Sequence, residues 1–235
     1  MDGLRVKFDF SGVRVLVTGG SNGIGLGIAT AFAESGAEVT ITGMRSSASE
    51  YDHDLSAFSF ESVDVRDSSA LDALAASQDR LDILVNNAGS TDPAREWQPD
   101  GFQEAVSIHL FSTFRLSMGC QGALSKSVLG GGGSVLNMAS MTAFGAALWN
   151  PGYGASKAAI VELTKTLAVN WARQNVRVNC VAPGLIESNM TLHMKGDTEL
   201  EKIEVEKAPM ARWGTPTDVA PAFLYLASPA ASFVT

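Results

Sequence analysis

Short apolar runs alternate with longer amphipathic segments along the whole chain. The short runs are bounded by turn residues and have strand character, whereas the longer segments repeat their apolar positions at helical spacing. This pattern predicts strands over 13–17, 38–42, 58–63, 81–85, 133–138 and 176–181. It predicts helices over 23–35, 67–76, 101–127, 153–173 and 216–227.

Regular alternation of strands and helices predicts an α/β fold. The expected architecture is a doubly wound parallel sheet, covered by helices on both faces in three layers and joined by right-handed crossovers. The chain has 235 residues, 46% of them hydrophobic, which is enough to bury a full core. Because no repeat or linker divides the sequence, we expect one domain over 1–235.

Composition excludes several kinds of partner. The formal net charge of −8 argues against a nucleic-acid surface or an anionic membrane as partner. No apolar stretch reaches the roughly 18 residues of a membrane span, and the start Met1-Asp2-Gly3 does not resemble a signal peptide. Cys120 and Cys180 are expected to be free thiols in a reducing cytoplasm, and two cysteines alone cannot build a metal site.

A glycine-rich turn follows the first predicted strand. Gly19, Gly23 and Gly25 stand between the strand 13–17 and the helix 23–35. Glycine allows a sharp turn and a close approach of the backbone to phosphate, and the helix that follows offers its first amides to the anion. A plain loop is the alternative, but the position between a strand and a helix favours dinucleotide binding. The expected contacts are Gly19, Ser21, Asn22, Gly23, Ile24 and Gly25.

Tyr153 and Lys157 are four residues apart, so a helix would place both side chains on one face. A free phenol has a pKa of roughly 10, and a nearby cation is expected to lower that pKa. Pro151 and Gly152 suit the start of a helix, whose dipole would act in the same direction. The pair predicts a general acid/base, unless it is a chance pair on the surface.

These motifs together resemble the short-chain dehydrogenase/reductase family in its single-domain form. The resemblance runs over about 8–235 and includes Ser140, which lies 13 residues before Tyr153 as the catalytic serine of the family does. It implies a Rossmann fold and NAD(P)(H)-dependent interconversion of a ketone and a secondary alcohol by Ser140, Tyr153 and Lys157. It also implies cofactor contacts at Asp64, Val65, Asn87, Ala88, Gly89, Tyr153, Lys157, Pro183, Gly184, Ile186 and Ser188.

The resemblance assigns a role to each catalytic residue. Tyr153 would exchange a proton with the substrate oxygen, and Ser140 would stabilise the charge that develops on it. Lys157 would lower the pKa of Tyr153 and bind the nicotinamide ribose. His109 stands where the family has an asparagine whose carbonyl holds a relay water. It either preserves that relay, adds a group titrating near pH 6–7, or merely fills space.

The end of the second predicted strand bears on the choice of cofactor. An NAD-preferring site has an acidic residue about 20 residues beyond the glycine turn, but here Arg45, Ser46 and Ser47 follow the strand. A cation and hydroxyl groups suit a 2′-phosphate. NADP(H) is therefore favoured and NAD(H) is possible, with a solvated Arg45 as the alternative. Asn22 stands where many NADP-dependent relatives have a basic residue.

Substrate and assembly are less constrained. The segment 197–206 is acidic, which fits poorly with an acidic acyl-carrier protein. A free small-molecule ketone or alcohol is therefore expected ahead of a 3-oxoacyl thioester, and a non-catalytic nucleotide-binding protein is the remaining alternative. Surplus apolar positions on 101–127 and 153–173 predict a homo-oligomer, a dimer or a tetramer. The family has one more strand after Thr235, and without it a sheet edge would be exposed.

Overall fold

Six parallel strands form the central sheet in the computed structural model, which describes residues 7–196 and 198–235. The strands lie in the order β3-β2-β1-β4-β5-β6, so the strand order reverses between β1 and β4. Ligands of such sheets bind beyond the carboxyl ends of the strands at this reversal. The bounds are β1 (Arg14–Val17), β2 (Glu38–Gly43), β3 (Ser59–Ser62), β4 (Ile83–Asn86), β5 (Gly133–Met138) and β6 (Val176–Val181).

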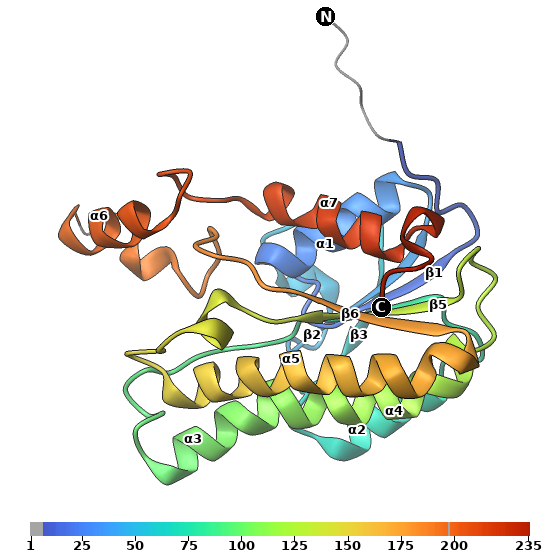
Figure 1. The fold of residues 1–235 in the computed structure, drawn as a ribbon, viewed down its shortest axis with the longest axis horizontal. Coiled ribbons are helices and arrows are strands. Elements are labelled where there is room, and N and C mark those ends of the chain that lie inside the picture. The colour runs from blue at the N-terminus through green and yellow to red at the C-terminus, as the bar shows by residue number, and fades with distance from the viewer. Residues whose placement is uncertain (1–6, 197) are drawn as a thin grey trace, which may run out of the picture.

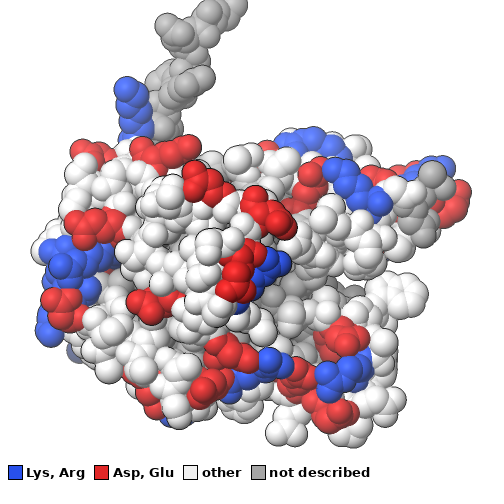
Figure 2. All heavy atoms as spheres, turned by 180° about the vertical axis from the view of Figure 1, so that it is seen from behind, with Lys and Arg blue, Asp and Glu red and all other residues white. Residues whose placement is uncertain are grey.

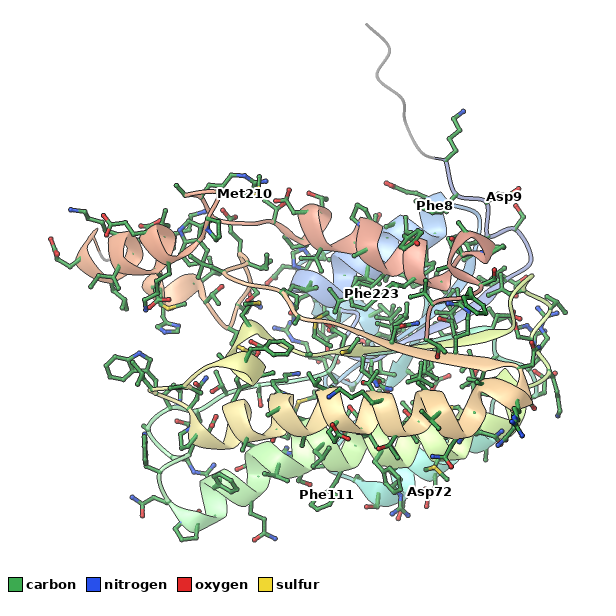
Figure 3. All side chains as sticks on the ribbon, in the orientation of Figure 1. Phe8, Asp9, Asp72, Phe111, Met210 and Phe223 are labelled. Carbon is green, nitrogen blue, oxygen red and sulfur yellow. The ribbon has the colours of Figure 1, made fainter. Side chains whose placement is uncertain are left out.

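Helices cover both faces of the sheet, which confirms the predicted doubly wound α/β fold with three layers (Figure 1). One face carries α1 (Gly23–Glu34) and α7 (Pro216–Ala227). The other carries α2 (Ser68–Ala76), α3 (Pro99–Val106), α4 (Ser112–Leu124) and α5 (Pro151–Trp171). Each face has its own buried apolar cluster. Phe223 of α7 points into the first cluster, whereas Phe111 lies on the outer side of the opposite layer (Figure 3).

The prediction of a single regular helix over 101–127 is wrong. The helical segment consists of α3, a π-helical turn η2 (Ser107–Phe111) and α4, and it ends at Leu124. The hydroxyl of Thr113 donates to the carbonyl of His109 at 2.8 Å, and that of Ser112 donates to Ile108. Such bonds to the carbonyl four residues back compete with the regular backbone pattern and bend helices. The π turn places His109 inside the molecule.

Helix α6 (Thr198–Lys207) is the second difference, because no helix was predicted there. It projects from the body of the molecule beside the carboxyl edge of the sheet (Figure 1). Its four glutamates and two lysines give it the acidic character read from the sequence. Asp197, the first residue of that acidic segment, lies outside the described residues, as does the start Met1-Asp2-Gly3.

The last residues of the chain lie beside β6. The Val234 carbonyl accepts a hydrogen bond from Asn179 Nδ2 at 2.9 Å, and the Thr235 hydroxyl accepts one from the N–H of Val178 at 3.0 Å. The expected exposed edge is therefore partly covered at these positions. Cys120 and Cys180 are both free thiols, and burial raises the pKa of Cys120 to about 12.

The described residues hold neither a candidate membrane span nor a candidate metal cluster. No helix within 7–196 and 198–235 is long and apolar enough to cross a membrane. The same residues contain no cluster of three histidine, cysteine, aspartate or glutamate side chains that could hold a metal ion.

Candidate active site

The glycine turn between β1 and α1 leaves no room for a side chain at Gly19 or Gly25. Gly19 and Gly23 have positive φ angles of 63° and 53°, which only glycine adopts freely. A Cβ on Gly25 would lie 2.2 Å from the carbonyl oxygen of Gly19. Asn22 begins α1 without a side-chain cap, and the first turn has no acidic residue. The start of α1 is therefore suited to an anion.

The loop after β4 is bonded directly to this turn. Thr18 Oγ1 accepts hydrogen bonds from the backbone N–H groups of Asn87 and Ala88, each at 3.0 Å. Asn87 Nδ2 in turn donates to the carbonyls of Thr18 at 2.9 Å and Gly19 at 3.1 Å. The two loops thus form one rigid floor at the strand-order reversal. Sequence reasoning did not single out Thr18, although a hydroxyl at the end of a buried strand was visible.

A cleft of about 700 Å³ extends across this floor. Most residues expected to contact a cofactor or to act in catalysis line it: Gly19, Ser21, Asn22, Gly23, Ile24, Gly25, Arg45, Asp64, Val65, Asn87, Ala88, Gly89, His109, Tyr153, Lys157 and Ser188. Five expected residues are not part of its wall: Ser46, Ser140, Pro183, Gly184 and Ile186. Ile186 is buried in the core instead, and the Ser46 hydroxyl bonds Glu50.

Tyr153, Ser140 and Lys157 come together where β5 meets α5. Lys157 Nζ donates to the carbonyl of Met138 at 2.7 Å and lies 5.4 Å from the centre of the Tyr153 ring. Ser140 follows β5 and begins a short 3-10 turn, where its Oγ accepts from the N–H of Thr142 at 3.2 Å. The three side chains expected to be catalytic thus belong to one cluster.

The expectation that Tyr153 has a lowered pKa is wrong in this structure. Burial raises the pKa of Tyr153, a hydrogen bond with Ser140 lowers it, and the negative charge of Glu96 raises it further. Burial also acts on Lys157, whose pKa falls to about 7 because the ammonium is removed from water. The phenol is therefore protonated at neutral pH and can act as a proton donor.

His109 lies against Tyr153 in the same cluster. Its ring is perpendicular to the phenol ring, with 5.0 Å between centres, and its Nε2 lies 2.7 Å from the carbonyl oxygen of Ser90. A carbonyl only accepts, so Nε2 carries the proton. Burial, with a smaller effect of the Lys157 charge, lowers the pKa of His109 to about 3. The titration expected near pH 6–7 is therefore not supported.

Arg45 and Tyr51 form one wall at the far end of the cleft. The guanidinium of Arg45 lies 4.8 Å from the centre of the Tyr51 ring, and the Tyr51 hydroxyl accepts from the backbone N–H of Arg45 at 3.0 Å. Asp64 lines the same end, and hydrogen bonds from Arg66 hold its pKa below the usual range. Arg45 therefore lines the cleft while its side chain stays exposed, so its role toward a 2′-phosphate remains a prediction.

The sequence matches a family model described as Enoyl-(Acyl carrier protein) reductase over residues 19–235. The chain is also 36% identical to the 3-oxoacyl-[acyl-carrier-protein] reductase FabG of Chlamydia pneumoniae, with 95% of this chain and 93% of that protein covered. The chain belongs to the short-chain dehydrogenase/reductase family. It is an oxidoreductase of this family, as its full-length relatives are.

Other short-chain dehydrogenases/reductases are equally similar. Galactitol 2-dehydrogenase (L-tagatose-forming) of Cereibacter sphaeroides is 36% identical, with 98% of this chain and 94% of that protein covered. Among solved structures, the complex of Pseudomonas aeruginosa RhlG with NADP in its active site superposes with a TM-score of 0.87 at 29% identity. It covers 99% of this chain and 95% of its own.

Besides Thr18, two residues of this short-chain dehydrogenase/reductase site, Glu96 and Thr91, were missed by sequence reasoning. The buried carboxylate of Glu96 accepts a hydrogen bond from the backbone N–H of Tyr153 at 2.8 Å. Glu96 also accepts one from the hydroxyl of Thr91, which lines the cleft, at 2.7 Å. No local pattern marks either residue, because the contact with Tyr153 spans 57 positions of the chain.

Proposed function

We propose that this protein is an NADP(H)-dependent oxidoreductase that interconverts a ketone and a secondary alcohol on a free small molecule. The observation that carries the proposal is the position of Ser140, Tyr153 and Lys157 beside the cleft that begins at the glycine turn. The residues suit a nicotinamide dinucleotide. The glycine turn leaves no room for a side chain at Gly19 or Gly25, and the start of α1 offers an uncapped set of amides.

The chain's own residues supply the proton half of the reaction. A nicotinamide dinucleotide supplies or accepts the hydride when bound. In reduction, Tyr153 Oη donates its proton to the carbonyl oxygen of the substrate while that oxygen gains negative charge. The Ser140 hydroxyl donates a hydrogen bond to the same oxygen and stabilises the charge. Lys157, buried beneath the phenol ring, is the neighbouring group that can return a proton to Tyr153.

Arg45 is the basis of the NADP(H) preference. Its position at the far end of the cleft suits a 2′-phosphate, and RhlG, a relative of the same fold, binds NADP. We expect Arg45→Asp to weaken NADPH binding by at least about 10-fold, or about 1.4 kcal/mol, and to spare or improve NADH binding. Fluorescence titration of both nucleotides measures this. A wild type that already prefers NADH would contradict the assignment.

The surroundings of the cleft support a free substrate over a carrier-bound one. The acidic helix α6 would repel an acidic carrier protein. Exposed Trp97, Phe144, Leu148 and Trp149 lie in loops that the family resemblance assigns to the substrate (90–97 and 141–150), and they offer apolar contacts there. The second candidate is a 3-oxoacyl-thioester reductase, which the similarity to FabG of Chlamydia pneumoniae favours. A non-catalytic nucleotide-binding role would not require Ser140 and Tyr153, so their presence beside Lys157 favours an enzyme.

We also infer that the protein acts in the cytoplasm as a homo-oligomer, without nucleic acid or membrane as partner. Free cysteines suit a reducing compartment. On the face drawn in Figure 2, basic side chains lie beside acidic ones rather than in one continuous patch. The net charge of −8 agrees with this distribution.

A substrate panel tests the proposed function. Ketones, secondary alcohols and 3-oxoacyl thioesters are offered with NADPH or NADH, and turnover is followed by the nicotinamide absorbance. We expect turnover of free ketones with NADPH, and a loss on the order of 100-fold or more in Tyr153→Phe with cofactor binding retained. Faster turnover of thioesters would favour the second candidate. Near-normal turnover in Tyr153→Phe would refute the mechanism.

A further inference from the structure

Glu96 is a buried carboxylate in the loop between β4 and α3, with 3% of its surface exposed. Its Oε2 accepts from the backbone N–H of Tyr153 at 2.8 Å. Its Oε1 accepts from Thr91 Oγ1 at 2.7 Å and from the N–H of Asp92 at 3.2 Å. A buried acid is stable only where its oxygens find donors. Glu96 therefore joins the wall of the cleft to the first turn of α5.

Helix α5 is capped through this contact. The usual cap is the residue at the N-cap position, whose side chain accepts an N–H of the first turn. Asn150 holds that position but makes no such bond, and its Nδ2 instead donates to Thr91 Oγ1 at 3.2 Å. Glu96 accepts the N–H of Tyr153 in its place. The backbone of Tyr153 is thus held by a residue from another loop.

The charged and titratable groups around Tyr153 come from three elements. His109 of η2 lies against the ring, and Lys157 of α5 lies 5.4 Å from the ring centre. Glu96 lies behind the backbone of Tyr153. His109 has a pKa of about 3 and is neutral at working pH. Lys157 and Glu96 are therefore the groups whose charge can act on the phenol.

We propose that Glu96 is a positioning residue. It fixes the position of Tyr153, at the start of α5, relative to Thr91 in the wall of the cleft. The proposal rests on the function proposed above, because it assigns Glu96 a role through Tyr153. Two effects follow. The hydrogen bond fixes where the phenol stands, and the negative charge favours the protonated phenol, which raises the pKa of Tyr153.

Two substitutions separate these effects. Glu96→Gln removes the charge and keeps the size and an acceptor oxygen, so the pKa of Tyr153 is expected to fall. Glu96→Asp keeps the charge but is too short to reach the N–H of Tyr153. We expect its kcat to fall by about 10-fold or more, because misplacing a catalytic group by about 1 Å costs on the order of 100-fold. Its KM for the cofactor should change little.

Asp82→Asn is the matched control. Asp82 is also a buried carboxylate that accepts three hydrogen bonds, from Arg14 N–H at 2.8 Å, Ser127 Oγ at 2.7 Å and Val128 N–H at 2.9 Å. It lies at the opposite end of the sheet, before β4 begins. Neutralising Asp82 should lower the stability of the fold, as neutralising any buried and hydrogen-bonded carboxylate would. It should leave the pKa of Tyr153 unchanged.

The pKa of Tyr153 is read without turnover, from tyrosinate absorbance as pH rises, with the Tyr153→Phe spectrum subtracted. A fall in Glu96→Gln but not in Asp82→Asn supports the proposal. An unchanged pKa in Glu96→Gln, an equal change in Asp82→Asn, or a wild-type kcat in Glu96→Asp would each overturn it. Absence of turnover in the wild type would instead refute the proposed function and leave the absorbance result standing.

Discussion

Lys157 and His109 are both buried bases beside Tyr153, and burial lowers the pKa of each. The ammonium of Lys157 has one hydrogen bond, to the Met138 carbonyl, and His109 donates to Ser90. Within the residues that the structure describes, neither side chain forms a hydrogen bond or an ion pair with a carboxylate. Protonating either side chain would therefore bury a positive charge without a neutralising partner, which costs free energy. Two predictions follow from this cost.

Lys157→Met is expected to abolish activity and to stabilise the fold. The pKa of Lys157 is about 7 in the folded state and 10.5 by its ordinary value. Below pH 7, Lys157 is protonated in both the folded and the unfolded protein, so the buried charge destabilises the folded protein fully. Between the two pKa values the folded state has lost its proton, and stability rises with pH.

The stabilisation by Lys157→Met should therefore be largest at about pH 6 and should be lost by about pH 10. The change in pKa corresponds to roughly 5 kcal/mol at most. The unpaired Met138 carbonyl offsets about 1–3 kcal/mol at either pH, so we expect a net gain of about 2–4 kcal/mol at about pH 6 and no gain at about pH 10. Urea unfolding at the two pH values measures it. A variant that is less stable than the wild type at about pH 6 would contradict this reading.

His109→Asn is expected to leave the shape of the pH–rate profile unchanged. With a pKa of about 3, the imidazole is already neutral throughout the range in which kcat/KM is measured. Asparagine is smaller and uncharged, so the rate should change while no inflection is gained or lost. The profile of kcat/KM against pH for both proteins decides it. Loss of an inflection near pH 6–7 in the variant would show that His109 titrates during turnover.

At the scale of elements, the glycine turn packs closely against the start of α1, and this packing requires residues without a side chain. Gly25→Ala would place a Cβ 2.2 Å from the Gly19 carbonyl and 2.4 Å from Asn87 Nδ2, so the turn has to shift. We expect the affinity for NADPH to fall by at least about 10-fold. Fluorescence titration of the nucleotide measures the change.

Gly122→Ala in α4 is the control for Gly25→Ala. A Cβ on Gly122 meets nothing within 4 Å, so alanine fits without strain. Alanine should stabilise the helix by about 0.5–1 kcal/mol and leave NADPH affinity unchanged. Wild-type affinity in Gly25→Ala would mean that the turn adapts and that its close packing is not needed for binding.

Elements with a local cause were predictable from the sequence. The strand β5 matches its predicted bounds of 133–138, and every one of its residues is buried, as expected for a central strand of a parallel sheet. Tyr153 and Lys157 share a face because helical spacing requires it. The π turn at 107–111 was not predictable from periodicity, because it accompanies hydroxyl bonds from Ser112 and Thr113 to backbone carbonyls.

Features that depend on distant parts of the chain could not be predicted. The pKa of Tyr153 is raised because other elements bury the side chain. The spacing of residues in the sequence does not reveal how deeply a side chain is buried. Glu96 caps α5 from 57 positions away. The fold and the grouping of the candidate catalytic residues were therefore predictable from the sequence, whereas the electrostatics of the site required the packed structure.

On the scale of the whole molecule, the outer side of α4 is an apolar face that is exposed to solvent. Phe111, Phe114 and Met118 are exposed there, and with Arg115 they line a groove of about 570 Å³ beside α2. Val169 of α5 is 82% exposed. Contiguous apolar surface of this kind marks an interaction site more often than a solvated face. A second copy of the chain is the expected occupant, as predicted from the sequence.

Phe114→Glu is expected to dissociate the homo-oligomer. A carboxylate at the centre of an apolar interface would be buried without a partner in each copy, and truncating or charging such a position commonly costs more than about 2 kcal/mol. The molar mass measured by size-exclusion chromatography with light scattering should therefore fall towards that of one chain, 24.7 kDa.

Met210→Glu is the control for this substitution, because Met210 is also apolar and exposed but lies on the opposite side of the sheet from Phe111 (Figure 3). It should leave the mass of the oligomer unchanged. If the wild type has the mass of one chain, the apolar face of α4 does not join copies of this protein. If Met210→Glu dissociates the oligomer and Phe114→Glu does not, the interface lies on the side of α6 and α7 instead.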